Sequence, residues 1–169
     1  MRAPNLVHFR NLTLAFAVLG AARGVAAVPT AASNVDRPIA GFCTVQSAPP
    51  EPVGPGQIRV VIDGVCQMSH LGRADVHIDE IVTYNPDGSA EGVAQTTMTA
   101  ADGDVLHARG LAHFEPPTAQ GIVLFAGDQV FTGGTGRFSG ATGQADILKG
   151  LVSLVTYEAG YEIDGRIIY

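Results

Sequence analysis

Apolar and polar residues alternate along most of this chain from Gln57 onward, as they do in strands that have one buried face. The alternation is clearest between Tyr157 and Tyr169, where every second residue is apolar or glycine and most of the residues between them are charged. Side chains of a strand point alternately to opposite faces of the sheet. This last segment therefore predicts an antiparallel strand with one face in the core and the other in water.

The remaining segments have the same pattern or are mostly apolar, and turn sequences separate them. Residues 85–88 (NPDG) and 101–104 (ADGD) are typical of tight turns, and two consecutive prolines at 116–117 end a strand. No amphipathic helix of useful length is indicated. We predict an all-β fold, a small antiparallel barrel of seven or eight strands over residues 57–169. Besides the last one, the expected strands lie within residues 57–71, 74–84, 93–101, 105–115, 122–131 and 146–156.

Residues 28–56 precede this region and are rich in alanine, proline and glycine. We interpret them as an extended lead-in to the barrel, with one strand near residues 42–45.

The first 27 residues have the features of a secretory signal peptide. Arg2 and Arg10 precede a short apolar run at 12–22, and small residues then offer a cleavage site after Ala27, with a second one after Ala32. The run is shorter than the roughly 20 apolar residues of a membrane span, which leaves a retained anchor as the alternative. We expect a secreted or periplasmic protein that does not insert into a membrane once the signal is removed.

Charge narrows the range of partners. Removal of residues 1–27 takes away three arginines and no acid, so that 7 basic and 16 acidic residues remain, a net charge of about −9. Lys149 is the only lysine. A chain that is this acidic and has no basic cluster is not expected to bind nucleic acid or an anionic membrane. The pattern does not indicate an oligomeric state.

Cys43 and Cys66 are the two cysteines of the chain. Export to an oxidising compartment favours a disulfide between them, and two buried free thiols are the alternative. Two cysteines are too few for a zinc site, and no Cys-x-x-Cys redox pair is present.

The segment 132–144 (TGGTGRFSGATGQ) holds five glycines between two expected strands. Such a density predicts a turn whose backbone needs positive φ or close approach at several points. Its G-x-G-x-x-x-G spacing differs from the dinucleotide fingerprint, and no helix pattern follows it. We therefore assign it a structural role. The glycines are Gly133, Gly134, Gly136, Gly140 and Gly143.

This glycine segment resembles the glycine loop shared by allene oxide cyclases and dirigent proteins, with a Gly-Gly-Thr-Gly-x-Phe core followed by small residues and a further glycine. Residues 64–169 are also similar to small exported bacterial proteins, which share a His-Leu-Gly element like residues 70–72. The resemblance implies a small antiparallel barrel whose apolar lumen hosts cyclisation or oriented radical coupling of hydrophobic molecules. The early-strand glutamate motif of the cyclases has no counterpart at residues 57–66, nor have the aspartates of dirigent proteins. The resemblance therefore implies the fold and not the activity.

One face of the segment 105–115 carries mostly small residues, among them Ala108, Gly110 and Ala112. If this face points inward, it leaves space in the lumen for a small hydrophobic ligand. A filled core is the alternative, in which these residues lie opposite bulky partners. The residues expected to line the ligand site are Met68, Tyr84, Ala108, Phe114 and Tyr161.

Two polar residues fall on otherwise apolar faces. Glu80 interrupts an apolar row on its strand, and His70 ends another. A buried carboxyl with a histidine partner is suited to general acid and base chemistry. The alternatives are that His70 binds the backbone of a turn, and that a bulge places Glu80 in water. We expect no metal site and no cofactor.

Three functions follow from this pattern. The protein is a carrier of a small hydrophobic molecule, a cofactor-free cyclase or isomerase that uses Glu80 and His70 as catalytic residues, or a purely structural exported barrel.

Overall fold

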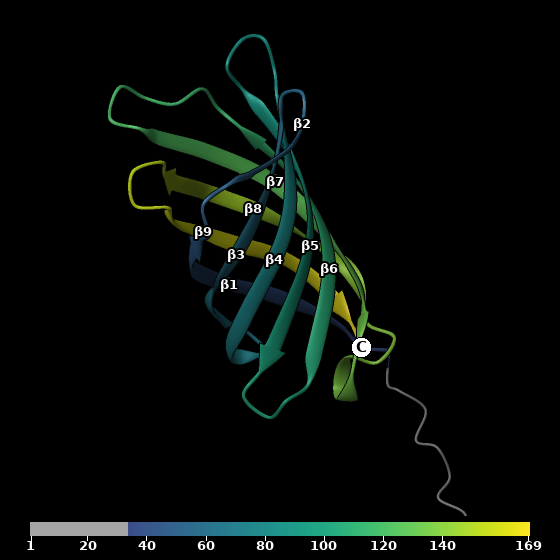
Figure 1. Cartoon of the computed structure of the whole chain (residues 1–169). Coiled ribbons are helices and arrows are strands. Elements are labelled where there is room, and N and C mark those ends of the chain that lie inside the picture. The colour runs from purple at the N-terminus through teal and green to yellow at the C-terminus, as the bar shows by residue number, and fades with distance from the viewer. Residues whose placement is uncertain (1–33) are drawn as a thin grey trace, which may run out of the picture. The chain divides into compact units, whose positions relative to one another are not determined.

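The computed structural model describes residues 34–169, and the expected signal peptide lies outside them. Nine strands and one short 3-10 helix make up this part (Figure 1). Within it, no helix is long and apolar enough to cross a membrane. The elements are β1 (Asp36–Ser47), β2 (Glu51–Gly54), β3 (Gln57–Met68), β4 (Gly72–Tyr84), β5 (Ala90–Ala100), β6 (Val105–Phe114), β7 (Ile122–Gly134), η1 (Gly136–Phe138), β8 (Thr142–Ser153) and β9 (Glu158–Ile168).

Eight of the strands close into an antiparallel barrel, and this confirms the predicted fold class. From β3 to β9 each strand pairs with the next one in sequence, and β1 closes the barrel by pairing with both β9 and β3. The short strand β2 pairs only with the start of β3. It lies at the end of the barrel that carries the loops after β4, β6 and β8, which we call the wide end (Figure 1).

The strand expected near residues 42–45 is present and lies within β1. The barrel boundary predicted at residue 57 is wrong, because β1 is one of the barrel strands. Inward-facing Ile39, Cys43 and Val45 are buried there. The alternation of this strand is hard to read in the sequence, because its outward face carries Phe42, half of whose surface is exposed (51%). The barrel therefore begins at Asp36.

A disulfide joins Cys43 of β1 to Cys66 of β3, as predicted. The two residues are direct partners in the β1–β3 ladder, so the bond crosses the seam at which the barrel closes. Their separation of 23 residues corresponds to a stabilisation of about 3 kcal/mol in the chain-entropy model.

The narrow end of the barrel is filled by side chains. The turns after β3, β5 and β7 meet there with the C-terminus (Figure 1). The largest fully buried side chain is Phe138 of η1. Arg137 beside it binds Asp102 and Asp104 of the β5–β6 turn and donates a hydrogen bond to the carbonyl of His70. The glycine segment thus places the Phe138 side chain so that it fills the narrow end of the barrel.

The glycines of this segment have the structural role that the sequence predicts. Gly133, Gly136, Gly140 and Gly143 have positive φ, which L side chains rarely adopt. Gly134 instead lies so close to β6 that a Cβ atom there would collide with the backbone carbonyl of Val105.

Candidate functional site

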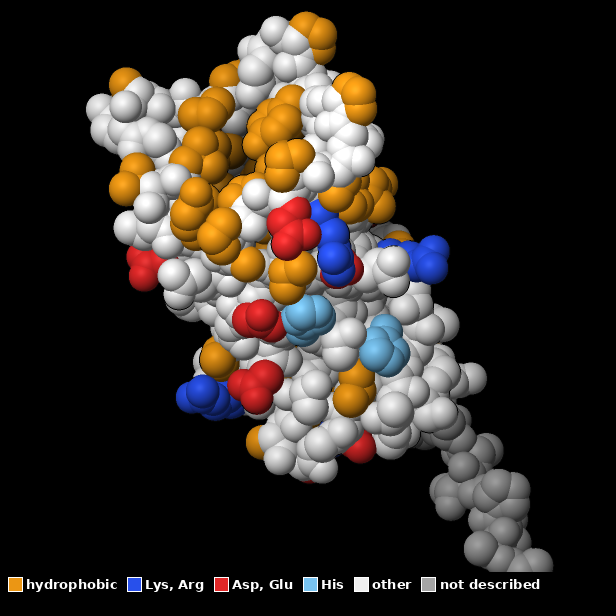
Figure 2. Space-filling model, viewed as in Figure 1, with side chains coloured by type: hydrophobic (Ala, Val, Ile, Leu, Met, Phe, Trp, Pro, Cys, Tyr) orange, Lys and Arg blue, Asp and Glu red, His pale blue; other side chains and the backbone are white. Residues whose placement is uncertain are grey.

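The wide end of the barrel holds an apolar cavity of about 180 Å³ that opens to solvent. Figure 2 shows hydrophobic side chains gathered around a hollow at this end, between the loops that follow β4, β6 and β8. The prediction of an open lumen is therefore favoured over a completely filled core. The apolar part of the lining includes Val60, Val82, Phe114, Val123, Phe125 and Tyr161.

Residue size explains why the barrel is open at one end and filled at the other. On the inward faces of β5 and β6, most residues that line the cavity are small, among them Ala94, Gly110 and Ala112, and Phe114 is the large one. Toward the narrow end the same faces carry Met98 and Leu106, neither of which has any exposed surface. Small inward side chains leave a space that the opposite wall does not fill.

Glu80 of β4 lines this cavity. The pairing of β4 with β3 and β5 continues through Glu80 without a register shift, so the alternative of a bulge is wrong. The residue is only 7% exposed. Because burial disfavours its charged form and no compensating charge or hydrogen bond offsets this within residues 34–169, the pKa of the Glu80 carboxyl rises to about 7.

Gly92 of β5 makes room for this carboxyl. A Cβ atom at Gly92 would collide with Oε1 of Glu80 and would come within 2.8 Å of the Phe114 ring. The glycine therefore allows the Glu80 side chain to lie against the wall of the cavity, beside Phe114.

Tyr161 of β9 is a second polar residue of the lining and is 7% exposed. Burial raises the pKa of its phenol, and the negative charge of Glu80 raises it further. The hydroxyl therefore stays protonated at neutral pH. Its ring lies 6.0 Å from that of Phe125, centroid to centroid.

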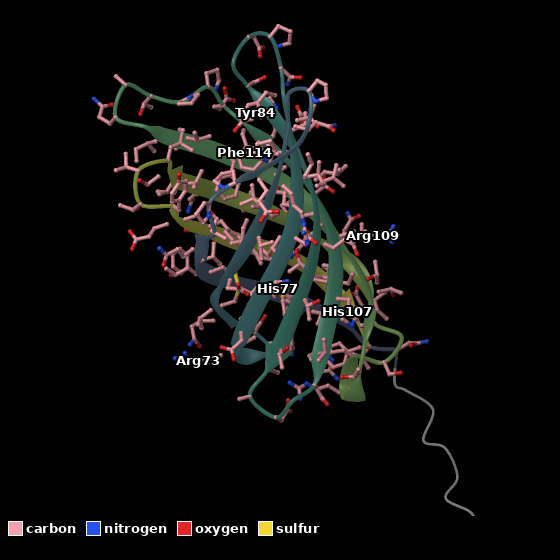
Figure 3. All side chains as sticks on the ribbon, viewed as in Figure 1. Arg73, His77, Tyr84, His107, Arg109 and Phe114 are labelled. Carbon is pink, nitrogen blue, oxygen red and sulfur yellow. A yellow bond between two sulfur atoms is a disulfide. The ribbon has the colours of Figure 1, made fainter. Side chains whose placement is uncertain are left out.

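Of the five residues expected to line the ligand site, three do so. Tyr84, Phe114 and Tyr161 line the cavity, and Figure 3 shows the first two near the wide end. Met68 and Ala108 also face inward, but they belong to the packed core of the narrow half. The inward direction was thus correct for Met68 and Ala108, and their level along the barrel axis was not.

His70 does not meet Glu80. It lies in the β3–β4 turn with a φ of 69°, its Nε2 atom is 2.9 Å from the carbonyl oxygen of Pro38, and its ring packs edge-on against Tyr169. From Gly72 to Glu80 the strand runs about 26 Å away from that turn. His70 therefore belongs to the narrow end, and the expected acid–base pair is not formed.

The sequence analysis missed two buried polar residues of the cavity wall, Thr96 and Gln129. Gln129 of β7 is 3% exposed, and its Nε2 atom has no hydrogen-bond partner in the described part of the chain. The signal was present, because Gln129 falls between Gly127 and Phe131 on a face that reads as apolar.

The remaining ionisable side chains lie mainly on the outside of the barrel, where His77 and His107 are labelled in Figure 3. His77 pairs with Asp63, and His113 pairs with Glu91, both at 2.7 Å. Between residues 34 and 169 no three histidine, cysteine, aspartate or glutamate side chains are placed to hold a metal ion.

Comparisons with known proteins support the fold and do not indicate a function. No family model and no curated protein matches the chain. The structure is similar to the crystal structure of a conserved protein of unknown function from Rhodopseudomonas palustris, with a TM-score of 0.54 and 10% identity over 78% of this chain and 96% of that one. A similarity at this identity shows a shared fold alone. The resemblance to allene oxide cyclases and dirigent proteins stays a prediction.

Proposed function

We propose that this protein binds a small hydrophobic molecule in the open end of its barrel. The observation that carries the proposal is the apolar cavity of about 180 Å³, whose wall holds a carboxyl with no partner among residues 34–169. A concave apolar site with a few polar groups is the usual make-up of a small-molecule site. A barrel with a purely structural role would gain stability by filling this space.

The size of the cavity limits the ligand. Drug-sized ligands occupy pockets of about 300–1,000 Å³, so this cavity suits a smaller molecule, such as one with two fused rings. Its wide mouth leaves room for such a ligand to extend toward solvent.

Naphthalene is a suitable probe, because the chain contains no tryptophan whose fluorescence would mask that of the probe. We expect saturable binding of one naphthalene per chain in a fluorescence titration. We also expect a rise in the unfolding temperature with naphthalene concentration, since a ligand that binds only the folded state stabilises it. Fluorescence that increases linearly without saturation, with no thermal shift, would contradict the proposal.

Glu80 favours a second candidate function, that of a cofactor-free isomerase or cyclase. A carboxyl whose pKa is near 7 accepts and returns protons at neutral pH. Tyr161, which stays protonated nearby, is the second polar group of the lining that such chemistry would use, in place of His70.

Hydrogen exchange into a bound ketone separates this enzyme from a carrier. In D₂O at neutral pD, we expect the protein to accelerate replacement of the methyl hydrogens of 2-acetylnaphthalene, followed by NMR. Each hydrogen leaves as a proton on the Glu80 carboxylate, and the enolate takes a deuteron in return. Glu80→Gln is expected to reduce the rate to that of buffer while naphthalene still binds. A wild-type rate equal to that of buffer would leave the carrier as the better description.

The disulfide is typical of proteins from oxidising compartments. It supports our proposal that the protein works outside the cytoplasm, as a secreted or periplasmic carrier.

A further inference from the structure

Glu80 and Gln129 lie at one level of the barrel wall. Glu80 pairs with Ala94 of β5, Ala94 with Gly110 of β6, and Gly110 with Gln129 of β7. Directly paired residues of a sheet project from the same face, and all four line the cavity. Neighbouring strands are about 4.8 Å apart, so the row measures about 14 Å along the wall, and less between side-chain ends that converge on the lumen.

The middle of this row has almost no side chain. Ala94 contributes one methyl group and Gly110 contributes none. A Cβ atom built at Gly110 would find its nearest neighbour, the Asp128 carbonyl, at 3.4 Å, so the space above Gly110 is not crowded. A stretch of wall with almost no side chains, formed by Ala94 and Gly110, therefore separates the Glu80 carboxyl from the Gln129 amide.

The nitrogen of the Gln129 amide has no hydrogen-bond partner among the described residues to offset its burial. The Gln129 residue is only 3% exposed, and its Nε2 atom has no hydrogen-bond partner within residues 34–169. A half-turn about the last side-chain bond exchanges the nitrogen and the oxygen, so the amide can present its N–H to the cavity. In that orientation an acceptor atom of a ligand in the cavity can pair with the amide N–H, and a paired polar group costs less to bury than an unpaired one.

We propose, on the basis of the carrier function above, that the ligand is a neutral carbonyl compound whose oxygen lies between Gln129 and Glu80. The amide N–H of Gln129 donates one hydrogen bond to this oxygen, and the neutral carboxyl of Glu80 donates a second. A carbonyl oxygen has two lone pairs and satisfies both donors. The apolar body of the ligand lies over Ala94 and Gly110 and extends toward the mouth. Gln129 thus contributes, together with Glu80, to specificity for ketones over hydrocarbons.

A pair of probes with the same shape tests this inference. 2-Acetylnaphthalene carries the carbonyl, and 2-isopropenylnaphthalene has a CH₂ group in place of the oxygen. At pH 6, where Glu80 is largely neutral, we expect the wild type to bind the ketone more tightly by about three- to tenfold, after correction for their different solubilities. Gln129→Leu keeps the side-chain size and is expected to reduce this preference by weakening the ketone alone, because only the Glu80 carboxyl then donates to the ketone oxygen. Gln144→Leu, on the outward face of β8, is the matched control and is expected to keep it.

The outcomes separate this inference from the carrier function. Equal binding of both probes by the wild type, or an unchanged preference in Gln129→Leu, would overturn the carbonyl site while leaving the carrier function intact. Binding of neither probe would overturn the carrier function itself. The comparison of the two probes on the wild type needs no variant, so it decides the question even if Gln129→Leu folds poorly.

Discussion

Ala112→Leu is expected to abolish naphthalene binding and to leave the barrel folded. Ala112 lines the cavity on β6, and its partners across the neighbouring strands are Gly92 and Gly127, neither of which has a side chain. A leucine at this position projects from the wall into the cavity, where it takes the place of the ligand. We expect the free energy of unfolding to change by less than about 1.5 kcal/mol, measured by urea unfolding alongside the fluorescence titration.

Ala108→Leu is the matched control, because Ala108 lies on the same strand and the same inward face, four residues earlier in the sequence. It lies in the packed half of the barrel. Overpacking there is expected to cost about 1–3 kcal/mol of stability and to leave the cavity itself in place. If Ala112→Leu destabilises the protein as much as Ala108→Leu does, the cavity is not available space and the carrier function is contradicted.

Glu80→Gln is expected to make the protein more stable above neutral pH. The folded state holds the Glu80 proton up to a pKa of about 7, against 4.5 for the ordinary carboxyl, so it binds more protons than the unfolded chain between these pH values. Wild-type stability therefore falls as pH rises through this window, by an amount on the order of 3 kcal/mol, and does not recover above it. Glutamine cannot ionise, and the variant should lack this fall.

The difference between wild type and variant isolates Glu80 from the other titrating groups. Tyr161 faces it and stays protonated throughout, and Glu115 lies near the mouth of the same cavity. The raised pKa of His113, caused first by its hydrogen bond to Glu91, contributes stability that is lost as pH rises, and it does so in both proteins. Parallel profiles from pH 4.5 to 8, measured by urea unfolding, would show that the Glu80 carboxyl is solvated and not buried.

Local pattern was enough to predict the barrel wall. Alternation assigned the inward faces of β4, β6 and β9 correctly, including Glu80, Phe114 and Tyr161. It could do so because the period of a strand fixes which face a residue occupies. The glycine segment was interpreted correctly for the same reason, since positive φ is a local requirement.

Properties that depend on pairing across the barrel could not be read in this way. Ala108 and Ala112 look alike in the sequence, and only strand register shows that one is packed and the other borders a cavity. His70 follows the apolar face of β3 in sequence, yet the chain reverses at that residue and leaves it at the opposite end from the carboxyl. A strand was expected near residues 42–45, but the proline-rich surroundings and the exposed Phe42 hid the full extent of β1 and its place in the barrel.

The double pairing of β1 also bears on whether two copies of this chain can exchange a strand. Without β1, the seven strands from β3 to β9 would form an open sheet. Its β9 edge would be unpaired, and so would the part of the β3 edge that β2 does not cover. Such edges readily accept a strand from another copy. Because β1 comes first in sequence and completes both edges at once, it is the element that two copies could exchange with each other. The Cys43–Cys66 bond ties β1 to its own β3. Besides stabilising the fold, the disulfide therefore opposes the exchange of β1 between two copies of the chain.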